Sequence, residues 1–200
     1  MQLKKGQLLI AIVFVIGLIF FTPLFLMRKN YEFIVYVCVI IFFLIIILIT
    51  DKKVNYPNSV LWGLTIWAIL HMAGGGIYFS NVRLYEIILI PLSKSYPIFR
   101  YDQFVHIFGF GVATLVMFCI LKPVLQPNLN KWTALSIVVI MAGLGVGALN
   151  EIVEFFVSVI VPQSGVGGYL NTALDLVSNF IGALIAMIFI RLKHKSYFPN

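Results

Sequence analysis

Six ionisable residues of this sequence lie inside, or at the edge of, long apolar segments. They are His71, Asp102, His106, Glu151, Glu154 and Asp175. An ionisable side chain within a bilayer is costly unless it faces a polar interior, so such residues are functional candidates by default. Imidazole and carboxylate groups are ligands of divalent metals, and they also form proton relays. The residue types therefore predict a metal site or a proton-transfer site.

The spacing of these residues places them in pairs on helix faces. The pairs are Asp102 with His106, Glu151 with Glu154, and Asp175 with Asn179. Side chains three or four positions apart lie on the same face of an α-helix. Each of three helices is therefore predicted to present two polar groups in one direction.

The elements that must position these groups are membrane-spanning helices. Hydrophobic residues make up 62% of the 200 residues and charged residues 10%, whereas soluble domains carry roughly 25% charged residues. The apolar runs are about 20 residues long, which matches a bilayer-spanning helix, and they do not alternate with polar residues as a barrel strand would. The sequence predicts an all-α, polytopic transmembrane bundle in the cell membrane.

About six spans are expected within a single integral membrane domain, residues 1–200. The predicted spans are residues 7–27, 33–50, 60–79, 102–122, 132–161 and 172–190. The longest connection, 80–101, contains an apolar stretch that is too short to cross and is interrupted by Pro91, which favours a re-entrant or interfacial segment. The glycine-rich loop 163–171 could fold over the site.

The distribution of basic residues predicts the orientation. With the N-terminus inside, the inner segments hold Lys4, Lys5, Lys52, Lys53, Lys122, Lys131, Arg191, Lys193 and Lys195. The outer segments hold Arg28, Lys29, Arg83, Lys94 and Arg100. This bias predicts that both termini are cytoplasmic. Because the basic residues flank apolar spans, membrane lipids are the expected partners and nucleic acid is not.

The predicted topology brings the polar groups to one depth. At about 1.5 Å of rise per residue, all of them fall within roughly 15 Å of the outer boundary. Four helices contribute, counting the helix that carries His71. A shared depth predicts one polar site in the outer half of the membrane.

The motifs that carry these residues resemble a known family. They are the segments 70–74, 100–106, 150–154 and 171–175, with Asn179 and Gly182 after them. Over roughly 60–190, their order and spacing resemble the YjdF-like family of bacterial integral membrane proteins. A thinner pattern is similar to VanZ-like proteins, which are linked with glycopeptide-antibiotic tolerance, although those proteins usually have Gln where this chain has Glu154. The resemblance implies a membrane fold and no particular activity.

One hypothesis for the site is a metal-dependent intramembrane hydrolase or transferase that acts on a lipid or lipid-linked envelope substrate. The expected metal ligands are His71 and His106 with one or two carboxylates, for which Glu154 and Asp175 are the first candidates and Asp102 a third, and Asp102 is also an expected catalytic residue. Mixed nitrogen and oxygen ligands suit zinc, and Glu151 would act as general base. The residues expected to surround and orient the ligands are Asn150, Asn179, Arg100 and Tyr101.

Two other functions fit the same residues. Clustered carboxylates and histidines also serve proton-coupled transporters, although the polar groups do not continue into the inner half and no inverted repeat is visible. In a membrane scaffold, Asp102 would be a helix N-cap and Asp175 a first-turn residue favoured by the helix dipole, while His71 would be a hydrogen-bonded packing residue. The sequence leaves these alternatives open.

Overall fold

Six long helices make up most of the computed structural model, which describes residues 4–125, 131–162 and 164–193. They are α1 (Gln7–Met27), α2 (Tyr31–Val54), α3 (Asn58–Gly76), α4 (Tyr101–Leu121), α5 (Trp132–Ile160) and α6 (Tyr169–Leu192). The short elements are β1 (Tyr78–Phe79), β2 (Val82–Arg83) and the 3₁₀ turns η1 (Leu84–Glu86) and η2 (Lys122–Val124). All six helices in the described ranges are long and apolar enough to cross a membrane. The predicted all-α transmembrane bundle is confirmed.

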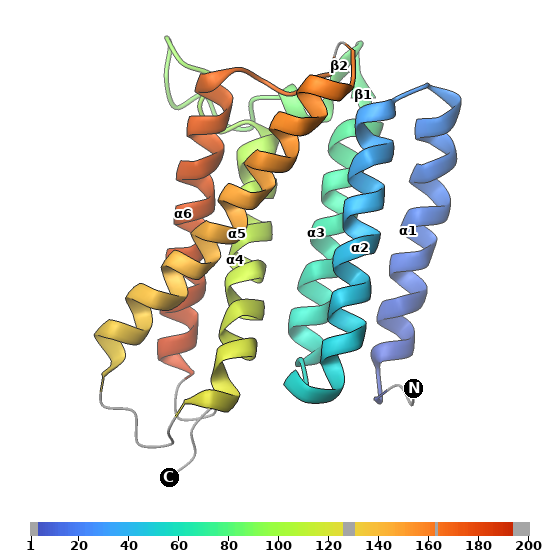
Figure 1. Cartoon of the computed structure of the whole chain (residues 1–200). Helices are drawn as coiled ribbons and strands as arrows, with labels where there is room; N and C mark the ends of the chain where they lie inside the picture. The colour runs from blue at the N-terminus through green and yellow to red at the C-terminus, as the bar shows by residue number, and fades with distance from the viewer. Residues whose placement is uncertain (1–3, 126–130, 163, 194–200) are drawn as a thin grey trace.

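The helices run alternately up and down, so α1 begins and α6 ends at the same end of the bundle, called here the terminal end (Figure 1). The opposite end carries β1 and β2 and is called the hairpin end. Helices α1 to α3 lie on one side of the bundle and α4 to α6 on the other, and α5 is inclined to its neighbours (Figure 1). Two residues used in the predictions, Gln163 in the loop and Lys195 in the inner segment, lie outside the described residues.

Glycine allows α4 and α6 to approach closely. A Cβ atom added to Gly182 would overlap the carbonyl oxygen of Ile107 and lie 2.8 Å from the backbone nitrogen of Gly111. A Cβ on Gly111 would in turn lie 3.2 Å from the carbonyl oxygen of Gly182. Small residues permit such backbone contact between membrane helices, where packing drives association. This contact brings the polar residues of α4 beside those of α6.

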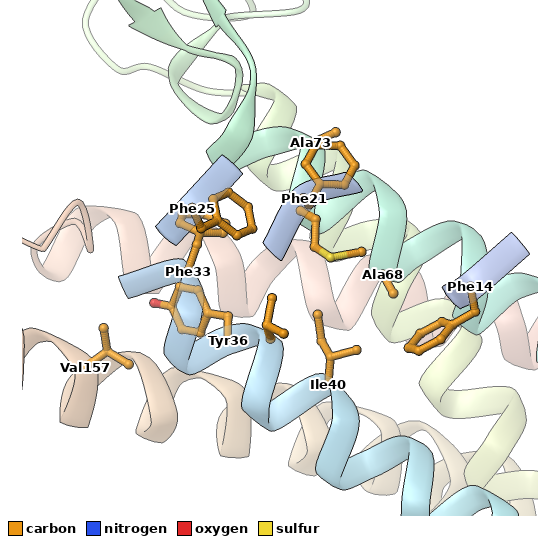
Figure 2. Close-up of a cluster of buried hydrophobic side chains, with 11 residues drawn as sticks. Phe14, Phe21, Phe25, Phe33, Tyr36, Ile40, Ala68, Ala73 and Val157 are labelled. Carbon is orange, nitrogen blue, oxygen red and sulfur yellow. The ribbon is translucent and has the colours of Figure 1, made fainter. Parts of the chain in front are cut away.

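Aromatic side chains hold the other side of the bundle together near the hairpin end. Phe25 of α1 packs against Phe33 of α2, with ring centroids 5.2 Å apart, and Phe33 packs edge-on against Tyr36 at 5.3 Å. Gly75 of α3 makes room for the Phe33 ring, because a Cβ there would overlap it. Val157 of α5 belongs to the same buried cluster (Figure 2). This cluster therefore joins α2 to α5.

Helix α2 is longer than the predicted 33–50, since it continues through the charged residues Asp51 and Lys52 to Val54. Asp51 accepts hydrogen bonds from Lys4 Nζ at 2.9 Å, from Gln7 Nε2 at 3.1 Å and from the backbone nitrogen of Tyr56. The start of α1 thus neutralises the charged end of α2 and allows the helix to extend. The predicted end of this helix at residue 50 was too early because it was placed before the first charged residue. Helix α6 likewise begins three residues before the predicted 172, and α3 ends at Gly76, three before 79.

The connection 77–100 forms an irregular cover over the hairpin end (Figure 1). Tyr78 pairs with Arg83 in a two-stranded hairpin, and an isolated bridge joins Ile88 to Arg100. Within the described residues this connection contains no membrane-re-entrant helix. The aromatic ring of Tyr85 packs on Gly74, where an added Cβ would overlap it. The connection packs directly on α3, the helix that carries His71, and its re-entrant or interfacial position stays a prediction.

Candidate metal centre

His106 of α4 lies at the centre of the polar residues and is 4% exposed. Its Nε2 atom is 3.5 Å from Asp102 Oδ1 and 3.9 Å from Glu154 Oε1. Its Nδ1 atom is 2.9 Å from Asn179 Oδ1 and 3.8 Å from Glu151 Oε1. Helices α4, α5 and α6 therefore each place oxygen atoms around one buried imidazole.

Two groups of side chains are close enough to share a metal ion. In one group, ligand atoms of Asp102, His106 and Asp175 all lie within 4.8 Å of one another. The same limit holds for His106, Glu151 and Glu154. We call these five residues the His106 cluster. The structure brings together five of the six ionisable residues that the sequence singled out.

The hydrogen bond to Asn179 fixes the state of the His106 ring. An amide oxygen only accepts, so His106 Nδ1 donates to Asn179 Oδ1. In the neutral ring, the lone pair is then on Nε2, on the side of Asp102 and Glu154. A histidine whose other nitrogen is held in this way is typical of metal ligands. Asn179 therefore lies against His106, and its role in orienting a metal ligand stays a prediction.

Neutral amides hold the carboxylates from outside. Gln103 Nε2 donates to Asp175 Oδ1 at 3.3 Å, and Asn171 Nδ2 donates to Asp175 Oδ2 at 2.5 Å. The Asn171 amide also lies 3.4 Å from Asp102 Oδ2. On α5, Asn150 Nδ2 donates to Glu154 Oε1 at 2.7 Å. These donors orient the carboxylates and add no positive charge.

Glu151 is the exception within the cluster. It is 9% exposed, and both of its carboxylate oxygens are buried without a hydrogen-bond partner among the described residues. Asn179 Nδ2 is also buried without one. Unpartnered polar atoms in a low-dielectric interior are expensive, and native proteins rarely leave them so. The arrangement fits a bound cation beside Glu151.

A polar cavity of about 210 Å³ opens beside the cluster at the hairpin end. Asp102 and Glu154 line it together with His71, Arg100 and Asn171. Gly165 to Gly167, which precede α6, line it as well. The predicted folding of the glycine-rich loop over the site agrees with this lining. A small polar group could therefore reach the cluster from the hairpin end.

His71 lies in the cavity wall and outside both metal-ligand groups of the described residues. Its Nδ1 is 2.6 Å from the hydroxyl of Tyr85, and its ring packs against those of Tyr36 and Trp67 at 5.2 and 5.6 Å. Burial, with the negative charge of Asp102, raises the pKa of Tyr85 well above its ordinary value. The Tyr85 phenol therefore stays protonated and can donate to His71 Nδ1 when that nitrogen carries no proton. A ligand role for His71 stays a prediction.

Arg100 and Tyr101 are at the start of α4. The Tyr101 hydroxyl donates to the carbonyl oxygen of Leu70 at 3.1 Å, which ties α4 to α3. The backbone nitrogen of Arg100 donates to Gln103 Oε1 at 2.6 Å, which caps the helix. Arg100 Nε is buried without a hydrogen-bond partner among the described residues. Tyr101 thus positions the helix, whereas Arg100 contributes positive charge to the cavity.

Glu32 is a site residue that the sequence analysis missed. It is 6% exposed, and its Oε2 accepts from Arg83 Nη1 at 3.2 Å and from the backbone nitrogen of Gly165 at 2.6 Å. Burial alone would lower the pKa of Arg83, but the ion pair with Glu32 raises it. The available signal was an acidic residue in the first turn of an apolar helix. Glu32 joins both connecting segments that line the cavity.

Gln103 and Asn171 also had no place in the predicted ligand surroundings. Asn171 precedes Asp175 by four residues and so faces the same way on α6, which was a readable signal. Gln103 is a polar residue between Asp102 and His106, and its part as the partner of Asp175 depends on the contact between α4 and α6.

The comparisons with known proteins give one family. The family described as "Predicted membrane protein (DUF2238)" matches residues 7–196. No curated protein and no solved structure matches the chain. The YjdF-like resemblance fits this result loosely, and the VanZ-like resemblance stays a prediction. With nearly all of its length matched and six helices able to cross a bilayer, the chain belongs to the DUF2238 family and is a multi-pass membrane protein.

Proposed function

We propose that the protein is a metal-dependent intramembrane hydrolase or transferase that acts on a lipid or lipid-linked envelope substrate. The observation that carries the proposal is Glu151, a buried carboxylate whose two oxygens have no partner among the described residues. It lies 3.8 Å from His106 in a cluster of four carboxylates and one imidazole. A divalent cation would balance part of this charge, and zinc suits the mixed nitrogen and oxygen ligands.

The nitrogen–oxygen pairs nearest to a zinc geometry join His106 Nε2 to Asp102 Oδ1 in one metal-ligand group and to Glu154 Oε1 in the other. The nitrogen lies 3.5 Å from the first oxygen and 3.9 Å from the second. Ligands bound at about 2.0–2.2 Å in a tetrahedral site are about 3.3–3.6 Å apart, so small side-chain movements would complete the site. Asp175 is close enough to share an ion with His106 and Asp102. Three protein ligands would leave one position open, as in catalytic zinc sites.

In this proposal Glu151 acts as the general base. A zinc-bound water has its pKa lowered to about 7, and a carboxylate without other partners can accept its proton. Asn179 then keeps its role of orienting His106. The polar cavity would admit the reacting part of a substrate, and the predicted topology puts this cavity at the level of lipid head groups.

The two alternatives have less support. A proton-coupled transporter needs a polar path to the terminal end, and the large cavity on that side has mainly apolar walls within the described residues. A purely structural polar cluster would be expected to hydrogen-bond its buried groups, as Gln103 does Asp175, and the Glu151 oxygens have no hydrogen-bond partner among the described residues.

The test is the metal content of the detergent-purified protein, measured by elemental mass spectrometry in the wild type, His106→Ala and His71→Ala. We expect about one zinc per chain in the wild type and in His71→Ala, and none in His106→Ala, which loses the central ligand. Adding zinc to chelator-treated wild type should raise its melting temperature, since a ligand at 100 times its Kd stabilises by about 2.7 kcal/mol.

His106→Ala should show no such zinc-dependent rise, and this readout separates lost binding from lost folding. The proposal of a metal-dependent enzyme would be refuted if the wild type contained no zinc and its melting temperature did not respond to zinc, manganese or other divalent metals. Loss of metal in His71→Ala as well would restore the wider ligand set predicted from the sequence.

A further inference from the structure

A second cavity, of about 560 Å³, lies between the two halves of the bundle. Its volume is within the roughly 300–1,000 Å³ of pockets that hold small organic ligands. We call it the apolar crevice. Its walls include Ile40, Leu44, Ala113, Val146, Leu149 and Val153. The polar residues Gln7, Asp51 and Tyr56 lie at its terminal end.

The crevice arises from the inclination of α5. Near the hairpin end, Val157 of α5 joins the aromatic cluster with Phe33 and Tyr36. Toward the terminal end, α5 leans away from α2 (Figure 1). Empty apolar space forfeits van der Waals contacts and does not favour water, so hydrocarbon is the matching occupant.

The apolar crevice and the polar cavity meet at one turn of α5. Asn150 lines the crevice, Glu154 lines the cavity, and the amide of Asn150 donates to the Glu154 carboxylate at 2.7 Å. A molecule with its polar part beside the His106 cluster could therefore extend its apolar part along α5. The two cavities together match the shape of an amphiphile.

The charge of the polar cavity points to the head group. Arg83 and Arg100 both line it. Arg83 is paired with Glu32, whereas Arg100 Nε is buried without a hydrogen-bond partner among the described residues. Guanidinium groups and metal ions are the usual partners of phosphate oxygens. The four carboxylates would repel an anion unless a metal offset them, so this step rests on the proposed metal centre.

We propose that the substrate is a membrane lipid with an anionic, phosphate-type head group in the polar cavity and one hydrocarbon tail in the apolar crevice. Arg100 binds the head group and Asn150 marks the junction with the tail. This proposal rests on the proposed function and names its substrate class. It assigns the crevice to the tail of the bound lipid rather than to a passing bilayer lipid.

The experiment is photo-crosslinking of the zinc-loaded protein in nanodiscs of phosphatidylcholine. The probe is a phosphatidylglycerol with a diazirine in the middle of one acyl chain, and the labelled peptides are mapped by mass spectrometry. We expect label on crevice residues of α2, α4 and α5. Ala113→Phe should fill the crevice and reduce that label about tenfold, while Ile188→Phe, on a lipid-exposed position of α6, should leave it unchanged.

Arg100→Gln tests whether Arg100 binds the anionic head group. It should reduce crevice labelling by the phosphatidylglycerol probe to the level given by the matching phosphatidylcholine probe. Equal crevice labelling by both probes in the wild type would overturn the anionic head group. Label spread over exposed faces and insensitive to Ala113→Phe would overturn the tail site.

The metal content of each variant separates this proposal from the proposed function. Ala113→Phe should keep its zinc, because Ala113 lies in the crevice wall and is not a cluster residue. Crevice labelling in a protein that binds no metal would refute the metal centre and the head-group site built on it. Normal zinc with no crevice labelling would refute the tail site alone.

Discussion

Two helix contacts in this bundle have opposite character. Helices α4 and α6 meet at Gly111 and Gly182, where the backbones touch and no side chain intervenes. Helices α2 and α5 meet through Tyr36 and Val157 near the hairpin end and leave a large cavity beside them. The α4–α6 contact fixes the positions of backbone atoms, whereas the α2–α5 contact leaves a cavity. The proposed metal and lipid site needs both features.

The close contact carries most of the polar cluster. His106 lies one residue before Ile107, whose carbonyl oxygen faces Gly182, and its partner Asn179 lies one turn before Gly182. A rigid backbone therefore sets the distance between imidazole and amide, as preorganised sites require. The aromatic contact on the α2 side sets no such distance, because ring stacking tolerates small shifts.

The largest predicted effect comes from breaking the close contact with Gly182→Ala. The new Cβ would overlap the Ile107 carbonyl and crowd the Gly111 nitrogen, and both are backbone atoms that cannot rotate away. We expect destabilisation at the upper end of the roughly 1–3 kcal/mol typical of overpacking. Loss of bound metal should accompany it, since α4 and α6 must separate. Thermal unfolding in detergent and metal analysis measure the two effects.

Gly145→Ala is the matched control for this substitution. Gly145 lies on α5, and a Cβ there meets nothing within 4 Å among the described residues. Alanine should stabilise the helix by roughly 0.5–1 kcal/mol. If Gly182→Ala unfolded at the wild-type temperature and kept its metal, close backbone approach would not be what holds the cluster.

The same contrast explains how much the sequence could predict. Long apolar runs report membrane crossing directly, because a backbone in lipid must bond to itself. The His106 cluster was predictable because helical spacing put Asp102 on the face of His106, and alternating helix directions put Glu151 and Asp175 at the same depth. Depth and face are properties of single helices, and a sequence displays them.

What the sequence could not give depends on lateral arrangement. His71 lines the polar cavity, but it packs on Tyr36 and hydrogen-bonds to Tyr85, and it lies outside the metal-ligand groups of the described residues. Glu32 lies in the first turn of α2, and its partners Arg83 and Gly165 belong to connections between other helices. Nothing in the local pattern states which helices are adjacent, and the crevice likewise results from the inclination of α5.

A smaller effect is expected from Glu32→Gln, which acts on the α2 side alone. The substitution removes the charge that holds Arg83 and weakens the bond from the Gly165 nitrogen. Loss of the charge that accepts hydrogen bonds from the partly buried Arg83 and from the Gly165 nitrogen should cost about 1–3 kcal/mol. We expect this cost as faster hydrogen exchange in residues 82–86 and at Gly165, with unchanged metal content.

Glu86→Gln is the control for this variant, because Glu86 is an exposed glutamate of the same connection. It should leave hydrogen exchange near the wild-type rate. If Glu32→Gln instead emptied the metal site, the α2 side would be coupled to the His106 cluster, and the two helix contacts would not act independently.

The smallest effect belongs to Tyr85→Phe, which removes one hydrogen bond and keeps the ring against Gly74. Losing the bond to His71 should cost about 0.5–1.5 kcal/mol. The pH dependence has a definite sign. Because the pKa of Tyr85 is raised in the folded protein, its contribution to stability is complete below the unfolded value of about 10 and falls as the pH rises above it. The wild type should therefore lose its advantage over Tyr85→Phe only in alkaline solution, as paired melting curves at neutral pH and above pH 10 would reveal.

The zinc affinity of Tyr85→Phe tests whether His71 is a metal ligand, since the outer partner of a metal-bound histidine typically contributes about 10–100-fold in affinity. An unchanged zinc affinity in Tyr85→Phe would restrict the metal to the rigid α4–α6 side, and a tenfold loss would extend the site across to α3.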